Sequence, residues 1–195
     1  MDVSKGERFN LTKETGGDEH FYIGLGWNAG QDHDLDASVF GSTYNANGDP
    51  KLTTDKHFVY FRNLKTPSGS IIHSGDNLTG DGDGDDEQIR IHLDKLEAEG
   101  VQEVSIVVTL YNAVSKGQNF GQVNRAYVRV CQMDSAGNPT TELVKFPLSD
   151  DYSKFTAVQV GQIYKRDSDG AWAFNPTGVG YENAGIGEVL AYYAN

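Results

Sequence analysis

The chain has 195 residues, enough for one domain with a substantial core, and its 37% hydrophobic and 11% aromatic content excludes an intrinsically disordered protein. Sixteen Lys and Arg residues against 28 Asp and Glu residues give a formal net charge of −12. This charge excludes nucleic acid as an expected partner and opposes docking on anionic lipid, unless bound cations reverse the local potential.

Alternation of apolar and polar residues predicts strands along most of the chain. Ile23, Leu25 and Trp27 share one face of the first strand, and a second alternation covers residues 88–93. The glycines around Leu25 indicate close strand packing, because a dinucleotide fingerprint needs a third glycine and a following helix. Further strands are predicted at residues 57–62, 70–73, 103–112, 126–133, 142–146, 158–165 and 171–175.

Turns rich in Gly, Asn, Asp and Pro separate these strands, and helical segments are few and short. Helices are predicted over residues 93–98, near Ser149 and over residues 186–193. Many short strands without a helix between each pair predict an all-β fold, a two-sheet antiparallel β-sandwich with a few short helices. No repeat or linker interrupts the chain, so we expect one domain over residues 1–195.

Asp34 and Asp36 flank Leu35 in the first of two candidate metal-binding segments. In an extended strand this spacing points both carboxylates to one face while the leucine enters the core. The two side chains could then bind the same ion. A solvated strand end is the alternative interpretation, because such pairs are common on protein surfaces.

The second candidate segment is the acidic, glycine-rich stretch over residues 75–87. Its acidic residues are Asp76, Asp81, Asp83, Asp85, Asp86 and Glu87. No Lys or Arg occurs between Lys65 and Arg90, so each carboxylate raises the cost of ionising its neighbours unless a cation lies among them. Four interleaved glycines allow the left-handed backbone conformations that bend a chain around an ion. The alternative is an unstructured acidic turn.

The ligand chemistry of this segment favours calcium. It offers many oxygen donors, but no Cys and no internal His, which favours a hard cation over zinc. A flexible ring of anionic oxygens suits calcium better than the strict octahedron of magnesium. An EF-hand loop is rejected, because Asp86 stands where the loop needs glycine and His92 replaces its final glutamate.

Two other functions compete with a calcium-binding role. Asp34 and Asp36 after an apolar strand, followed by residues 82–86, imitate the motifs of a magnesium-dependent, haloacid-dehalogenase-like phosphatase. That chemistry needs a parallel sheet with alternating helices, whereas strands and turns are predicted between the two motifs. A calcium-dependent module that binds membranes or carbohydrate is the other alternative. His33, His57 and His73 have no evident catalytic partner and are interpreted as structural or solvated.

The single cysteine and the absence of apolar segments bear on compartment. Cys131 cannot form an intramolecular disulfide, and its alternation with Val128 and Val130 predicts a buried, unreactive thiol. The sequence shows neither a signal peptide nor a long apolar span. We therefore expect a cytoplasmic protein without direct membrane insertion.

Several motifs together resemble the TerD family of tellurite-resistance and stress proteins. They are Gly24-Leu25-Gly26-Trp27, Asp34-Leu35-Asp36-Ala37-Ser38, Gly75-Asp76-Asn77 through Thr79-Gly80, Gly84-Asp85-Asp86-Glu87, Asn119-Phe120-Gly121-Gln122-Val123, Gly161-Gln162-Ile163-Tyr164 and Trp172-Ala173-Phe174. The match spans most of the chain in one consistent order, which makes the combined signal specific.

The resemblance implies a β-sandwich that binds calcium. The positions that match the family pattern are Asp34, Asp36, Asp76, Asn77, Asp85, Asp86 and Glu87. Asp81 and Asp83 are further candidates from position and charge. Nine side chains can serve two neighbouring ions if some carboxylates bridge.

The resemblance also implies a biological setting. Other Ter-type stress proteins, some of them at the membrane, are the expected partners, and through them the protein would lie at the periphery of the inner membrane. We expect calcium-dependent stabilisation and protein–protein interaction rather than catalysis. The charge of −12 and the single thiol disfavour direct capture of tellurite, which is an oxyanion.

Overall fold

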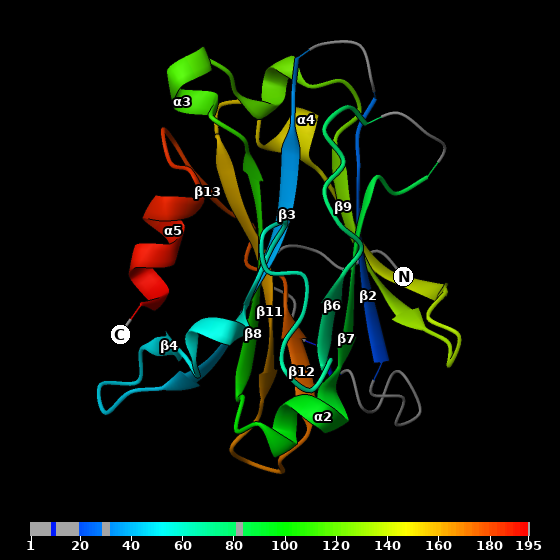
Figure 1. The fold of residues 1–195 in the computed structure, drawn as a ribbon, viewed down its shortest axis with the longest axis vertical. Helices are drawn as coiled ribbons and strands as arrows, with labels where there is room; N and C mark the ends of the chain where they lie inside the picture. The colour runs from blue at the N-terminus through cyan, green and yellow to red at the C-terminus, as the bar shows by residue number, and fades with distance from the viewer. Residues whose placement is uncertain (1–8, 11–19, 29–31, 81–83, 195) are drawn as a thin grey trace.

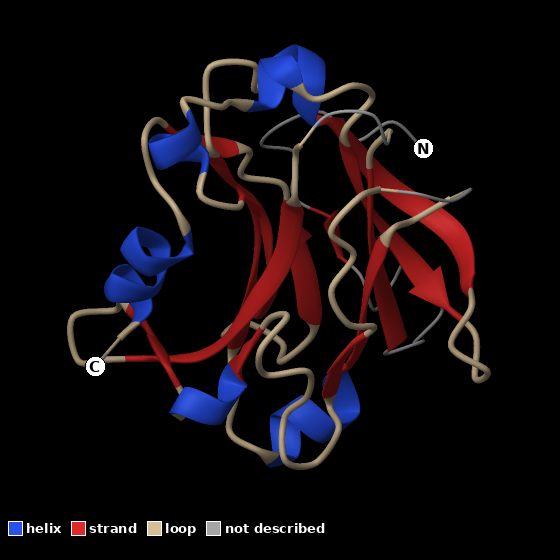
Figure 2. Cartoon of the chain, turned by 45° about the horizontal axis from the view of Figure 1, so that its top comes forward, coloured by secondary structure: helices blue, strands red, loops and turns tan. Residues whose placement is uncertain are grey.

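The structure is a computed structural model that describes residues 9–10, 20–28, 32–80 and 84–194. Two antiparallel sheets pack against each other, and short helices lie around their ends and on the outer face of the larger sheet (Figures 1 and 2). The predicted two-sheet antiparallel β-sandwich with a few short helices is confirmed. No helix among the described residues is both long and apolar enough to cross a membrane.

The larger sheet contains the strand that bears Asp36. Its strands are β1 (Phe9–Asn10), β3 (Leu35–Tyr44), β4 (Pro50–Leu52), β5 (Phe58–Val59), β8 (Glu103–Leu110), β11 (Ala157–Lys165), β12 (Trp172–Asn175) and β13 (Val179–Tyr181). Their order is β1-β12-β11-β8-β3-β4, with β13 on β11 and β5 on β3. The ten-residue β3 pairs with β8 from Leu35 to Ser42, which fixes its direction and register.

The smaller sheet contributes the acidic segment. Its strands are β2 (His20–Gly26), β6 (Ile71–His73), β7 (Glu87–His92), β9 (Tyr127–Met133) and β10 (Pro139–Pro147), in the order β10-β9-β2-β7-β6. The stretch of residues 75–86 connects β6 to β7, and β2 pairs with β7 from His20 to Leu25. The segment is therefore held at both ends by the sheet.

The main core lies between the two sheets and follows the period-two pattern. Ile23 and Leu25 of β2 belong to the same core cluster as Leu35 and Val39 of β3, and all four are completely buried. Tyr22 and Cys131 lie on the other face of the smaller sheet, where burial raises the pKa of the thiol to about 11. The predicted burial of Cys131 is confirmed.

Short helices and turns complete the described fold. The helices are α2 (Leu93–Ala98), α3 (Ala113–Lys116), α4 (Leu148–Asp151) and α5 (Ile186–Tyr193), with 3-10 turns η1 (Asp55–His57) and η2 (Phe120–Gln122). The helices predicted over 93–98 and 186–193 are confirmed, and α4 lies at the predicted position near Ser149. The helix α5 packs on the outer face of the larger sheet through Val189 and Tyr193.

The strand predicted over residues 57–62 is wrong for most of its length. His57 ends η1, β5 covers only Phe58–Val59, and the chain then reverses through paired backbone hydrogen bonds between Tyr60 and Asn63. The Asn63 amide donates to the Phe58 carbonyl at 2.6 Å and thereby holds the reversal. A side-chain contact of this kind competes with strand pairing and leaves no periodic signal.

Candidate metal centre

Three carboxylates meet at the start of β3. This end of the strand lies in the upper part of Figure 1. Ligand oxygens of Asp34, Asp36 and Asp76 all lie within 4.8 Å of one another. Leu35 is fully buried between the first two, as the alternation predicts, and Asp36 is only 3% exposed. The structure thus brings the two candidate segments together through Asp76, a residue that only the family resemblance had linked to Asp34 and Asp36.

Glu87 holds the two segments in place. Its Oε2 atom accepts a hydrogen bond from the Ala37 N–H at 2.7 Å, and its Oε1 atom accepts one from the Asn77 N–H at 3.4 Å. Each of these residues directly follows an aspartate of the cluster. The Glu87 side chain is fully buried, so its position is set by packing as well as by these bonds. Its observed contacts make Glu87 a positioning group beside the three carboxylates.

His73 completes the support of β3 at the same point. Its Nδ1 atom accepts a hydrogen bond from the Gly75 N–H at 3.0 Å, so Nε2 carries the proton and donates to the Ala37 carbonyl at 3.1 Å. The other neighbours of β3 on this side, β5 and β4, pair with it only from Val39 onward. Side chains from the smaller sheet therefore bind the backbone of Ala37, and the interpretation of His73 as structural is confirmed.

The loop after β6 takes its shape from Asn77 and two glycines. The Asn77 side-chain oxygen accepts hydrogen bonds from the N–H groups of Thr79 and Gly80 at 3.1 and 3.0 Å, which forms a tight turn. Gly75 and Gly80 have φ values of 111° and 64°, in the left-handed region that favours glycine. A Cβ atom on Gly80 would lie 2.4 Å from the indole nitrogen of Trp27. The expected left-handed backbone is therefore present.

Ionising the carboxylates of the cluster is costly when no cation is bound. Burial raises the pKa of Asp36 from 3.8 to about 8, and the nearby carboxylates, first of them Glu87, add to the shift. Burial likewise raises the pKa of Asp34 to about 6, with Asp76 as the next cause. Among the described residues, the Oδ1 atom of Asp34 is buried and has no hydrogen-bond partner. The raised pKa values and the unpartnered oxygen are both features that a bound cation would relieve, by favouring the ionised carboxylates and by contacting the free oxygen.

The surroundings of the cluster fit a hard cation. A cavity of about 330 Å³ lies over it, lined by Asp34, Asp36, Phe61, Arg62, Asp76, Leu78 and Tyr111. The donor set is all oxygen, which suits calcium or magnesium and not a soft metal. Asp34, Asp36 and Asp76 are the residues that would hold such an ion.

Asp85 lies elsewhere, on the outer face of the smaller sheet. Arg129 forks onto its carboxylate, with Nη2 at 2.7 Å and Nε at 3.0 Å, and the hydroxyls of Tyr22 and Tyr127 donate to it at 2.8 and 2.9 Å. Burial alone would raise the pKa of Asp85, but these hydrogen bonds outweigh burial and hold the pKa below its usual range. The carboxylate also lies directly over Gly24, where a Cβ atom would be 2.2 Å away.

The cation that balances Asp85 was missed by reasoning on local sequence. Arg129 is 44 residues away in the chain, and only the pairing of β2 with β9 brings it close. The premise that the acidic segment has no cation near it holds for sequence neighbours but is wrong in space. Its basic partner leaves Asp85 outside the three-carboxylate cluster.

Asp86 and Asn77 organise the loop. The carboxylate of Asp86 accepts hydrogen bonds from the backbone N–H of Trp27 at 2.8 Å and from the side-chain amide of Asn77 at 3.3 Å. Asp81 and Asp83 lie outside the described residues. The described part of the chain gathers one all-carboxylate cluster, and the second ion expected from nine ligands stays a prediction.

Comparison with known proteins gives a consistent family. A model of the TerD domain matches residues 1–193. The chain is 40% identical over 197 residues to a tellurium resistance protein TerD of an Alcaligenes species, covering 99% of this chain and 96% of that protein. It is 35% identical over 198 residues to general stress protein 16U of Bacillus subtilis, with the same coverage of both chains.

A solved structure gives the same fold. The crystal structure of a homologue of the telluride resistance protein TerD from Streptomyces coelicolor A3(2) matches with a TM-score of 0.70 and 23% sequence identity, covering 92% of this chain and 100% of that one. The domain match over nearly the whole sequence and the relatives named for tellurium resistance and general stress decide the assignment. The chain belongs to the TerD family of tellurium-resistance and stress-response proteins.

Proposed function

We propose that this protein binds calcium through Asp34, Asp36 and Asp76 and that the bound ion stabilises a surface for other stress-response proteins. The observation that carries the proposal is the cluster itself, whose three ligand oxygens lie within 4.8 Å and include an almost fully buried carboxylate. Calcium would neutralise these groups and fix the loop of residues 75–80 against β3. Binding, rather than catalysis, is the proposed activity, with other Ter-type proteins as partners.

The antiparallel fold argues against the phosphatase alternative. A haloacid-dehalogenase-like site needs a parallel sheet with helices between its strands, whereas every strand pair described here is antiparallel. Asp85, a residue of the imitated magnesium motif, is bound by Arg129. Calcium binding, unlike the phosphatase, requires neither a parallel sheet nor a free Asp85 carboxylate.

One observation favours a calcium-dependent ligand surface as a second candidate. Leu78 is 62% exposed and lines the same cavity as the cluster, together with Phe61 and Arg62. An exposed apolar side chain beside a bound cation is suited to contact a partner or an anionic membrane. Sedimentation with phosphatidylserine vesicles, with and without calcium, tests the membrane form, and Leu78→Ser should abolish it without changing calcium affinity.

Calorimetric titration tests the main proposal. Wild-type protein should bind calcium more tightly than magnesium, and Asp34→Asn and Asp36→Asn should each weaken calcium binding strongly. Asp85→Asn is the matched control, because its carboxylate belongs to the ion pair with Arg129. Equal loss in all three variants, or calcium binding unchanged in Asp36→Asn, would contradict the assignment of the ligands.

A further inference from the structure

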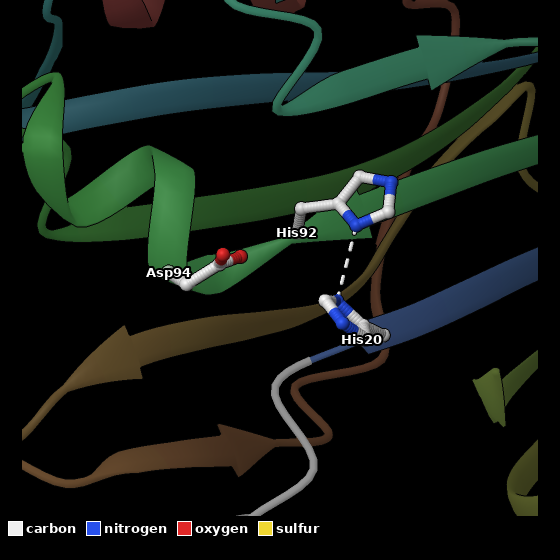
Figure 3. A group of neighbouring side chains, drawn as sticks. All are labelled: His20, His92 and Asp94. Carbon is white, nitrogen blue, oxygen red and sulfur yellow. Dashed lines mark hydrogen bonds between the residues drawn. The ribbon is translucent and has the colours of Figure 1, made fainter. Parts of the chain in front are cut away.

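A second group of metal-ligating side chains lies at the other end of β7. His20 is the first residue of β2, His92 is the last residue of β7, and Asp94 lies in the first turn of α2. One ligand atom from each lies within 4.8 Å of the others (Figure 3). Five steps along β7, about 17 Å, separate His92 from Glu87 beside the carboxylate cluster. The two groups are therefore distinct.

The two histidines form a direct cross-strand pair. His20 and His92 are opposite each other in the antiparallel register of β2 and β7, on the face away from the main core. Their Nδ1 atoms are 3.0 Å apart and their rings meet edge to face at 71° (Figure 3). His92 stands at the N-cap of α2 but makes no capping hydrogen bond with its side chain. Its imidazole is directed at His20 instead.

We propose that His20, His92 and Asp94 bind a borderline divalent transition-metal ion such as Zn²⁺, with water as a fourth ligand. Imidazole nitrogen with one carboxylate selects such metals, whereas calcium and magnesium prefer oxygen alone. Tetrahedral zinc holds its nitrogen ligands about 3.3 Å apart, given zinc–nitrogen bonds of about 2.0–2.1 Å. The 3.0 Å separation of the Nδ1 atoms is close to that value.

The site needs only small adjustments to receive the ion. The two imidazoles stand on paired strands, so their separation is fixed by the sheet. Asp94 is exposed, so its carboxylate can move to complete the coordination. The imidazole that donates the hydrogen bond between the rings must shift its proton from Nδ1 to Nε2, which costs no net proton release. A hydrogen bond between two neutral imidazoles is the competing explanation of the pair.

Titration of the full chain with Zn²⁺, in excess calcium, tests the proposal. We expect one zinc ion per chain at this site, and His20→Gln or His92→Gln should each weaken its binding by at least about tenfold. Asp94→Asn should weaken it less, and Asp36→Asn is the matched control that should leave it unchanged. Absence of zinc binding, wild-type affinity in both histidine variants, or loss only in Asp36→Asn would overturn the proposal.

Two spectroscopic measurements keep the test decisive if a variant does not fold. Co²⁺ in the wild-type protein should give the visible absorption of a tetrahedral site, and Zn²⁺ should displace it while calcium does not. Nitrogen NMR of the wild-type imidazoles should show zinc-dependent shifts at Nδ1 of His20 and His92. Shifts confined to His33, His57 or His73 would refute the assignment.

Discussion

Replacing Asp36 by asparagine should reverse the stability order of variant and wild type between calcium-free and calcium-loaded protein. The pKa of Asp36 is raised from 3.8 to about 8, and one pKa unit corresponds to about 1.36 kcal/mol. At pH 7 the folded protein therefore keeps a proton that the unfolded chain has lost, at a cost on the order of 4 kcal/mol. Asparagine removes the ionisation but keeps a buried polar group, so we expect it to recover about 1–3 kcal/mol.

Calcium should change the sign of this difference. At one thousand times its dissociation constant the ion adds about 4.1 kcal/mol to the wild-type protein, which exceeds the roughly 1–3 kcal/mol recovered by the variant, and the variant should lose most of that gain. For a domain of this size each kcal/mol shifts the melting temperature by about 2–4 °C. The variant should melt several degrees higher than the wild type in chelator, and lower in excess calcium.

Calorimetric melting in both conditions measures the crossover. Asp32→Asn is the matched control, because the Asp32 side chain is 91% exposed and lies next to the same strand. It should leave both melting temperatures close to wild type. If Asp36→Asn lowers the melting temperature in chelator as much as in calcium, Asp36 has a structural role and the reasoning from its pKa is refuted.

Three further predictions follow from the same geometry. In chelator, the free energy of unfolding of the wild type should fall as the pH rises from about 4 to about 8, because the raised pKa values of Asp34 and Asp36 mean that the unfolded state releases protons first. Chemical denaturation across this range measures the fall. A flat profile would mean that the carboxylates were already neutralised. Asp85→Asn should lower the free energy of unfolding by about 2 kcal/mol above pH 5, and this loss should shrink as the pH falls below 4, since the pKa of Asp85 is depressed. Urea denaturation measures the loss at each pH. An equal loss at pH 3 would contradict the prediction. Gly80→Ala should lower the free energy of unfolding by at least about 1–2 kcal/mol, because residue 80 has φ 64° and its added Cβ would meet the Trp27 side chain. Gly48→Ala is the control in thermal melts, because Gly48 also has a positive φ but faces open space. Equal losses in the two variants would show that the contact with Trp27 is not the cause.

Local sequence patterns predict much of the candidate site. The spacing of Asp34, Leu35 and Asp36 predicts two carboxylates on one face, and the structure places them together because β3 is extended there. The glycines of the acidic segment predict a left-handed backbone, and Gly75, Gly80 and Gly84 have it. Both inferences succeed because they depend on the conformation of a few consecutive residues.

Contacts between residues far apart in the sequence could not be predicted from local patterns. Asp85 and Asp86 are adjacent and equally acidic in sequence, yet one is bound by Arg129 and the other by the Trp27 N–H. Alternation along the chain points them in different directions, and only the order β9-β2-β7 decides which partner each one meets. The pairing of His20 with His92 likewise depends on strand register, because 72 residues separate them.

The contact of Glu87 with Ala37 has a consequence for solubility. A strand with free amide and carbonyl groups on one side is a template on which another molecule can add its own strand. Glu87 and His73 occupy those groups at Ala37, so the start of β3 is shielded from this association. Substitution of Glu87 would therefore leave the strand edge at Ala37 unpaired as well as loosen the carboxylate cluster. Self-association would be its first visible effect.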